Sequence, residues 1–198
     1  MPQMNEFDKT QLPKDLAIAW FFEENLETEW LSSVPAKIKA ISEKRIREYA
    51  ASRKALSLAC SIDEIDQLEI EAHHHLRNHP DIKVSLSHTR GLSAAVASRE
   101  LQSVGVDVEF IDREFNHKTS KFFLRDDDLE MPLLELWTIK EAAFKAIDPM
   151  GLKAADKDIL VLKDLVVRNL SIELEGKVIA KWLLQKHDGV MTAVAWVG

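Results

Sequence analysis

Hydrophobic and polar positions along the chain predict short strands arranged around two long helices. The apolar, aromatic run 16–22 favours an early strand. The sequence Ser33-Val34-Pro35 is typical of a helix start, and apolar residues at helical spacing predict a helix over 35–60. A second, shorter helix is expected over 63–77.

The middle of the chain predicts a hairpin and a further strand. Residues 83–88 alternate so that Ser85 and Ser87 share one face, and a turn at 89–91 leads into a returning strand over 92–98. After a polar connector, the segment 104–110 is the next predicted strand.

The last third of the chain predicts helices first and strands afterwards. A helix is expected around 115–124, followed by a charged loop over 125–130. Residues 133–147 have the apolar spacing of a longer helix, which Pro149 and Gly151 would close. From Ile159 onward we expect successive strands, with turns at Gly176 and Gly189.

Two segments half a chain apart resemble each other. Gly91–Ser98 and Gly189–Trp196 share the same residue at their Gly, Val and two Ala positions. The chain is therefore expected to be an α+β protein made of two similar halves in tandem, each ending in a hairpin. Each half would be a small antiparallel sheet packed on a long helix, with residues 1–102 and 103–198 as the two halves.

Composition excludes several classes of protein. A chain of 198 residues with 46% hydrophobic and 30% charged residues is ordinary for a globular fold and unlike a disordered chain. The net charge of −7 argues against general nucleic-acid binding. Apolar runs are too short to span a membrane, no basic segment precedes an apolar run at the start, and Cys60 is the only cysteine. We therefore expect a cytoplasmic protein without a membrane segment.

Positive charge is concentrated in the segment 37–54. Seven basic residues stand there against two acidic ones, in a chain that is acidic overall. Such a segment would attract an anionic partner or a phosphate-bearing ligand, or it is simply a solvated helix face.

Two carboxylates lie two residues apart on the strand predicted over 104–110. Asp107 and Glu109 would share one face, with Val106 and Val108 on the other. Carboxylates that close repel each other unless a cation lies between them, and Mg²⁺ prefers such oxygen ligands. The alternative is a half-solvated strand with two exposed acids.

Charged residues also interrupt the apolar stripe of the helix predicted over 133–147. Lys140 falls on the stripe and Glu141 borders it, while Lys145 follows Glu141 by one helical turn. Charged groups on the buried side of a helix require a partner or a ligand. The alternative is a surface Glu–Lys pair.

Two clusters containing histidine are weaker candidates. Ser87-His88-Thr89-Arg90, at a hairpin end, could hold a phosphate or could be ordinary turn residues. The run 73–75 with His79 could bind Zn²⁺ or Ni²⁺, although no Cys or acidic partner is nearby. The chain contains no P-loop or Rossmann glycine pattern.

Together these motifs resemble the 4′-phosphopantetheinyl transferase superfamily. The matching segments are Ser87-His88-Thr89, Gly105-Val-Asp-Val-Glu109 and Trp137-Thr-Ile-Lys-Glu-Ala-Ala-Phe-Lys145, with Gly151-Leu152 and Arg53 on the basic segment. The resemblance covers roughly residues 35–197, and the length is similar to that of the surfactin-type, pseudodimeric subclass.

The resemblance implies transfer of 4′-phosphopantetheine from coenzyme A to a serine of an acyl- or peptidyl-carrier protein, with release of 3′,5′-ADP. It implies that Asp107, Glu109 and Glu141 hold Mg²⁺. Glu141, or a water beside it, would accept the serine proton, and Lys145 would contact the phosphate or pantetheine. The residues implied for the 3′-phosphate of coenzyme A are Arg53, Ser87 and His88, with Lys140 as a further candidate.

One departure concerns His79, a further candidate for binding coenzyme A, which stands where members of that superfamily usually carry Lys or Arg before a proline. Histidine is a weaker cation at neutral pH. The carrier protein is expected to dock around 112–132, and the protein is expected to be a monomer. The alternatives are a homologue that binds coenzyme A or a carrier protein without catalysis, a Mg²⁺-dependent phosphohydrolase, and a metal-binding protein built on the histidine cluster.

Overall fold

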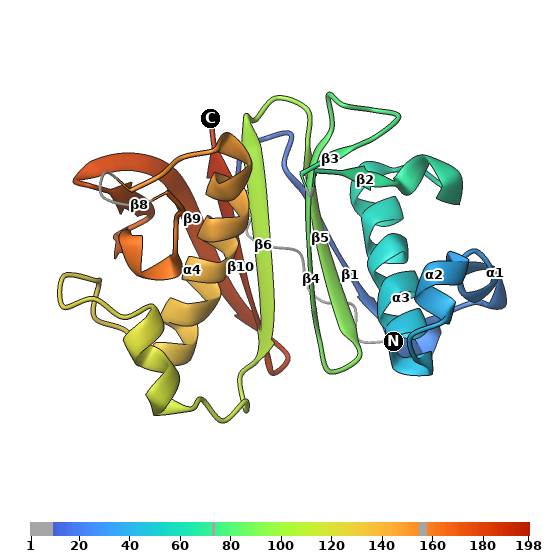
Figure 1. Ribbon diagram of the computed structural model, residues 1–198, viewed down its shortest axis with the longest axis horizontal. Helices are drawn as coiled ribbons and strands as arrows, with labels where there is room; N and C mark the ends of the chain where they lie inside the picture. Colours follow the sequence, from blue (N-terminus) through green and yellow to red (C-terminus); the bar gives the residue numbers. More distant parts are fainter. Residues whose placement is uncertain (1–9, 73, 155–157) are drawn as a thin grey trace.

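The fold was analysed in a computed structural model that describes residues 10–72, 74–154 and 158–198. It contains two five-stranded antiparallel sheets, with a long helix against the outer face of each (Figure 1). The layers run helix, sheet, sheet, helix, and this arrangement confirms the predicted α+β class with two tandem halves.

The strands divide evenly between the two halves, whereas the first half has more α-helices than the second. The first half contains β1 (Ala17–Phe22), α1 (Thr28–Ser32), α2 (Ala36–Lys39), α3 (Glu43–Cys60), β2 (Ile70–Glu71), β3 (His75–Leu76), β4 (Lys83–Thr89) and β5 (Leu92–Ser98). The second half contains β6 (Ser103–Phe110), α4 (Leu133–Ile147), β7 (Leu165–Arg168), β8 (Ser171–Leu174), β9 (Lys177–His187) and β10 (Val190–Val197).

The two sheets have the same topology. Their strand orders are β1-β5-β4-β3-β2 and β6-β10-β9-β8-β7, so each strand has a counterpart five places later in the chain. The resembling segments become β5 and β10, the second strand of each sheet. Each follows a hairpin turn at a glycine, Gly91 or Gly189, with φ of +79° or +77°, a conformation that favours glycine. The internal resemblance therefore marks equivalent positions.

Three of the predicted helices differ from the structure. The helix expected over 35–60 is broken between α2 and α3, because the side chain of Ser42 caps α3 by accepting from Arg45 N–H. The helix expected over 63–77 is wrong: a 3-10 turn at Ile65–Leu68 is followed by β2 and β3, whose connection includes Ala72 at φ 49°. The helix expected near 115–124 is a 3-10 helix, His117–Phe122.

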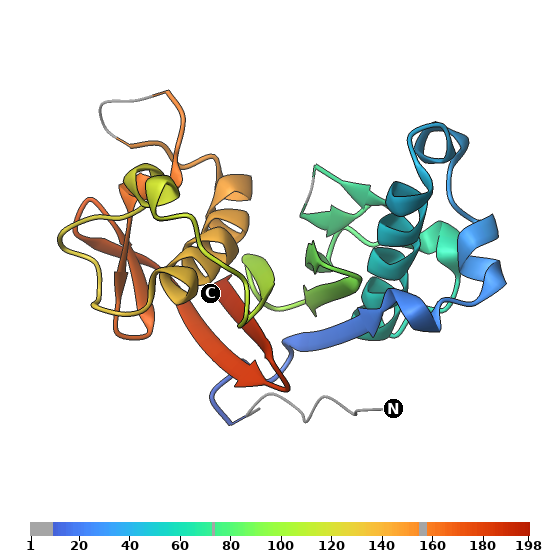
Figure 2. The ribbon, with the colours of Figure 1, turned by 90° about the horizontal axis from the view of Figure 1, so that it is seen from below.

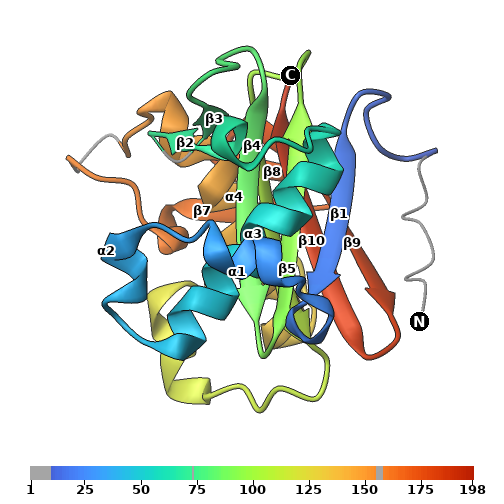
Figure 3. The same cartoon turned by 90° about the vertical axis from the view of Figure 1, so that its right-hand side faces the viewer.

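Strands β5, β6 and β10 are almost wholly buried on both of their faces. In the first half, α3 covers β4 and β5 (Figure 3), and in the second half α4 covers β6 and β10. A third apolar cluster lies between the two sheets and includes Val96, Val106 and Val194. Burial on both faces explains why β5 and β6 read as nearly continuous runs of small or apolar residues.

The two halves also touch through β1. Figure 2 shows β1 approaching the β9–β10 hairpin, where the Trp20 indole N–H donates to Thr192 Oγ1 at 3.0 Å. Among the described residues, no helix has the length and apolar character needed to cross a membrane.

Helix α4 approaches β6 most closely at Gly105. A Cβ atom on Gly105 would lie 2.0 Å from the carbonyl oxygen of Ala142 and 2.7 Å from the amide nitrogen of Ala146. Both atoms belong to the helix backbone and cannot rotate away. The glycine therefore sets the distance between α4 and the strand that carries Asp107 and Glu109.

We expect Gly105→Ala to lower the free energy of unfolding by about 1–3 kcal/mol or more, the usual cost of overpacking a buried contact. Chemical denaturation would measure this loss. Ser103→Ala, two residues earlier on the same strand, is the control, because the buried Ser103 hydroxyl has no hydrogen-bond partner in the described part of the chain. Equal stability of the two variants would contradict the close-approach argument.

Candidate functional site

The site forms where the free edge of β6 meets the face of β4. β6 is the first strand of its sheet, so one of its edges has no neighbouring strand in the described part of the chain. Ser85 and Ser87 lie on the face of β4 opposite α3, and their hydroxyl oxygens accept from the N–H groups of Val106 and Val108 at 3.2 and 3.4 Å. Because side chains alternate along β4 as predicted, both of its serines face the second half and contact β6.

Asp107 lies at the centre of this junction. Its Oδ1 accepts from the Ser87 hydroxyl at 2.7 Å and from Lys145 Nζ at 2.9 Å. Lys145 also donates to the carbonyl of Val106 at 3.0 Å, so the lysine bridges α4 and β6. The other oxygen of Asp107, Oδ2, is buried and has no hydrogen-bond partner among the described residues. A buried carboxylate oxygen without a donor is costly unless a ligand supplies one.

Glu109 faces the same way as Asp107 but has different partners. Its carboxylate accepts from the Thr89 hydroxyl at 3.2 Å and pairs with Arg113, which follows β6. The Glu109 side chain is nearly buried, whereas Arg113 is partly exposed. The two carboxylates predicted to share a face thus do so, and each is neutralised by one basic side chain.

Glu141 lies on α4, near enough to Asp107 for the two negative charges to interact. Burial raises the pKa of Glu141, and the negative charge of Asp107 raises it further. The positive charges of Lys145 and Arg113 act in the opposite direction. The site therefore has three carboxyl groups but only two basic side chains, Lys145 and Arg113, to balance their charge.

A cavity of about 960 Å³ opens beside this junction, between the two halves. The first half contributes Arg45, Tyr49, Arg53, Ser87 and His88 to its wall, and the second half contributes Phe144 and Lys145. Arg53 stacks on the Tyr49 ring at 4.6 Å, and its Nε is buried without a hydrogen-bond partner in the described part of the chain. A guanidinium N–H in that position is suited to an anionic ligand.

Arg45 is a site residue that the sequence reasoning did not single out. Its Nη1 lies 3.3 Å from His88 Nε2 and 3.2 Å from Glu48 Oε2, at the wall of the cavity. Burial of Glu48 opposes its charged form, but the Arg45 hydrogen bond and nearby positive charges outweigh this effect and lower its pKa. The sequence indicates only that Arg45 belongs to the basic segment 37–54. Its contact with His88 of β4 depends on the tertiary fold.

Two predicted binding residues lie elsewhere. Lys140 is completely buried and pairs with Asp128, 2.7 Å away, so its ammonium does not line the cavity. Burial lowers the pKa of Lys140, and the hydrogen bond to Asp128 opposes that effect. His79 is also not among the residues that line the cavity; its backbone takes part in the turn between β3 and β4. The structure thus gives no contact for His79 with this cavity.

The remaining histidine and cysteine candidates have ordinary structural surroundings. His74 and His75 stack edge to face, and His75 lies 4.0 Å from Glu71; His73 is outside the described residues. Burial lowers the pKa of His75. Burial raises the pKa of the Cys60 thiol to about 12, which leaves it unreactive near neutral pH.

The carboxylate oxygens of Asp107, Glu109 and Glu141 are the type of ligand that a divalent metal ion such as Mg²⁺ prefers. In the structure, however, these side chains do not converge on one point. In residues 10–72, 74–154 and 158–198, no three His, Cys, Asp or Glu side chains are grouped closely enough to hold a metal ion. Glu109 is turned to Arg113 and Asp107 to Lys145. The unpartnered Asp107 Oδ2 and the charge repulsion at Glu141 are the features that a bound cation would relieve.

Comparisons with known proteins do not name a family for this chain. No protein-family model matches the sequence, and a search of curated proteins finds no match.

We expect Glu141→Gln to stabilise the protein at neutral pH in the presence of EDTA. An acid whose pKa is raised by folding contributes stability that is fully present below its unfolded pKa and is lost as the pH rises through its folded pKa. The amide removes that loss, and each kcal/mol gained would raise Tm by about 2–4 °C in a chain of this size.

Thermal melts at pH 4 to 8 would measure the effect, which should disappear at the acid end. Glu135→Gln on the same helix is the control, because Glu135 is paired with Lys186 at 2.6 Å and should gain nothing from neutralisation. A Glu141→Gln variant that melts below the unchanged protein at pH 8 would contradict the electrostatic argument.

Proposed function

We propose that this protein is a 4′-phosphopantetheinyl transferase. It would transfer 4′-phosphopantetheine from coenzyme A to a serine of an acyl- or peptidyl-carrier protein. The observation that carries the proposal is the convergence of Ser87 from one half and Lys145 from the other on Asp107, beside a cavity between the halves. The motifs that resemble this superfamily thus meet at one place.

The cavity has the size and the groups for a nucleotide-containing ligand. At about 960 Å³ it is near the upper end of the usual range for small-molecule sites. Arg53, Arg45 and His88 lie on one wall and would hold a phosphate, with the Ser87 hydroxyl nearby. Lys145, from the second half, also lines the cavity and would contact the pyrophosphate.

In the reaction, the serine oxygen of the carrier protein forms a bond to the phosphorus that bears pantetheine. The bond from that phosphorus to the bridging oxygen breaks, and 3′,5′-ADP leaves with the electron pair. Asp107, Glu109 and Glu141 would hold Mg²⁺, and a cation bound there would supply positive charge to the attacked phosphate and the leaving group. Glu141, or a water beside it, would accept the serine proton. Lys145 would orient the phosphate through its ammonium.

The carrier protein would dock on the second half near the 3-10 helix His117–Phe122. Phe122 is 62% exposed there, and Lys121 lies over its ring at 4.8 Å. An exposed aromatic side chain with a neighbouring lysine suits an acidic partner helix. Because the two halves supply both walls of the cavity, a monomer would suffice, and we propose the cytoplasm as its location.

The proposal is tested by intact-mass spectrometry of an apo acyl carrier protein mixed with this protein, coenzyme A and Mg²⁺. We expect a gain of one phosphopantetheine group, abolished by EDTA and reduced at least about 100-fold in rate by Asp107→Ala. Release of free phosphopantetheine without a carrier would favour a phosphohydrolase instead. Coenzyme A binding without transfer to any of several carriers would favour a non-catalytic homologue.

Arg53→Ala should weaken coenzyme A binding about 10- to 100-fold, because it removes a charge-assisted hydrogen-bond donor from a phosphate. Isothermal titration calorimetry without a carrier protein would measure this loss. Arg99→Ala is the matched control: Arg99 pairs with Asp81 and does not line the cavity, so its removal should leave the affinity unchanged. Equal affinities for the two variants would remove Arg53 from the binding site.

A further inference from the structure

Helix α4 makes a second set of side-chain contacts, away from the cavity. Lys145 donates to Asp107, and Glu141 lies near enough to Asp107 to feel its charge. Trp137 and Lys140, three residues apart and therefore neighbours on the helix surface, both contact Phe123 instead. The sequence from Trp137 to Lys145 thus contains two pairs of residues with different partners.

Phe123 is held through both its ring and its backbone. Its side chain is completely buried and stacks edge to face on Trp137 at 5.3 Å and on Phe115 at 5.6 Å. Its carbonyl oxygen accepts from Lys140 Nζ at 2.6 Å. Phe123 immediately follows the 3-10 helix His117–Phe122, so these contacts fix the end of that exposed segment on α4.

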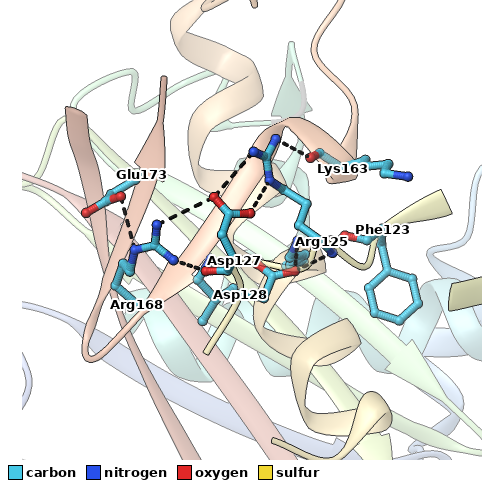
Figure 4. Close-up of polar contacts among 9 residues, drawn as sticks. Phe123, Arg125, Asp127, Asp128, Lys163, Arg168 and Glu173 are labelled. Carbon is cyan, nitrogen blue, oxygen red and sulfur yellow. Dashed lines mark hydrogen bonds and ion pairs between the residues drawn. The ribbon is translucent and has the colours of Figure 1, made fainter. Parts of the chain in front are cut away.

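Asp128, at the far end of the loop 123–128, also attaches this loop to α4 through Lys140. Its carboxylate lies 2.7 Å from Lys140 Nζ and accepts from the N–H groups of Arg125 at 2.8 Å and Val167 at 2.9 Å. The Lys140 and Asp128 side chains are 0% and 2% exposed. Figure 4 shows Asp128 beneath the more exposed ion pairs of Asp127 with Arg125 and Arg168. Such exposed pairs contribute little, so the buried pair is the decisive attachment.

We propose that Lys140 is a positioning residue that, with Asp128, fixes residues 123–128 on α4 and thereby holds His117–Phe122 as a rigid docking surface for the carrier protein. The docking part of this inference rests on the proposed transferase function; the attachment itself rests only on the contacts above. Lys140 therefore acts on carrier recognition, whereas its neighbour Glu141 acts at the carboxylate site.

The test compares Lys140→Met with the double variant Lys140→Met/Asp128→Asn. The single variant leaves a buried carboxylate without its counter-ion and is expected to be unstable. The double variant removes both charges and keeps a carbonyl acceptor for the Val167 N–H, but it loses the oxygen that accepts from the Arg125 N–H. It should therefore recover part of the lost Tm. Neither variant can bridge to the Phe123 carbonyl.

In the double variant, hydrogen exchange of the Phe123 and Leu124 amides should be at least about 10-fold faster than in the unchanged protein. The KM for the carrier protein should rise at least about 5-fold, with kcat and the Kd for coenzyme A within about twofold. Lys186→Met is the matched control, since Lys186 pairs with Glu135 of the same helix but is 46% exposed. It should change none of these quantities.

Unchanged amide exchange in the double variant would overturn the positioning role. Faster exchange with an unchanged KM for the carrier would overturn the docking consequence. If the unchanged protein transfers nothing to any carrier, the proposed function fails together with the docking consequence, and the exchange measurement still decides whether Lys140 fixes the loop.

Discussion

The unpaired edge of β6 is the constraint on which the site depends. Buried backbone N–H groups must find acceptors, and those of Val106 and Val108 have no strand beside them on that edge. The serines at alternate positions of β4 supply the acceptors, which fixes the position of β4 along β6. Ser87 is thereby held against Asp107, and Lys145 reaches the same strand by donating to the Val106 carbonyl.

The packing of the two repeated halves explains why each half needs the other to bury its apolar surface. Each sheet has one face covered by its own helix and the other covered by the second sheet. A single half would expose the apolar face that includes Val96 or Val106. The equivalent helices have also acquired different chemistry. α3 contributes Arg45 and Arg53 to the cavity, whereas α4 contributes Lys145 and, beside it, Glu141.

The local pattern of apolar and polar residues was sufficient to predict a helix or strand where that pattern has one strong periodicity. The bounds of α4 follow from its apolar spacing and from Pro149 and Gly151, and the two hairpins follow from alternation around Gly91 and Gly189. The segment 63–77 was misread because short apolar runs do not distinguish a helix from paired two-residue strands. Lys140 shows a different limit: its place on an apolar stripe indicated that its charge needs a partner or a ligand, but only the tertiary fold identifies Asp128 as a partner.

The carboxylate site raises the question of how Lys145 can serve both Asp107 and a ligand. An ammonium group has three N–H donors. Two are used on β6, one at the Val106 carbonyl and one at Asp107. The third remains for a group in the cavity that Lys145 lines. Lys145 can therefore hold a phosphate oxygen while it stays fixed to the strand. Because Gly105 sets the distance between α4 and β6, the same close contact that builds the core determines where that donor lies.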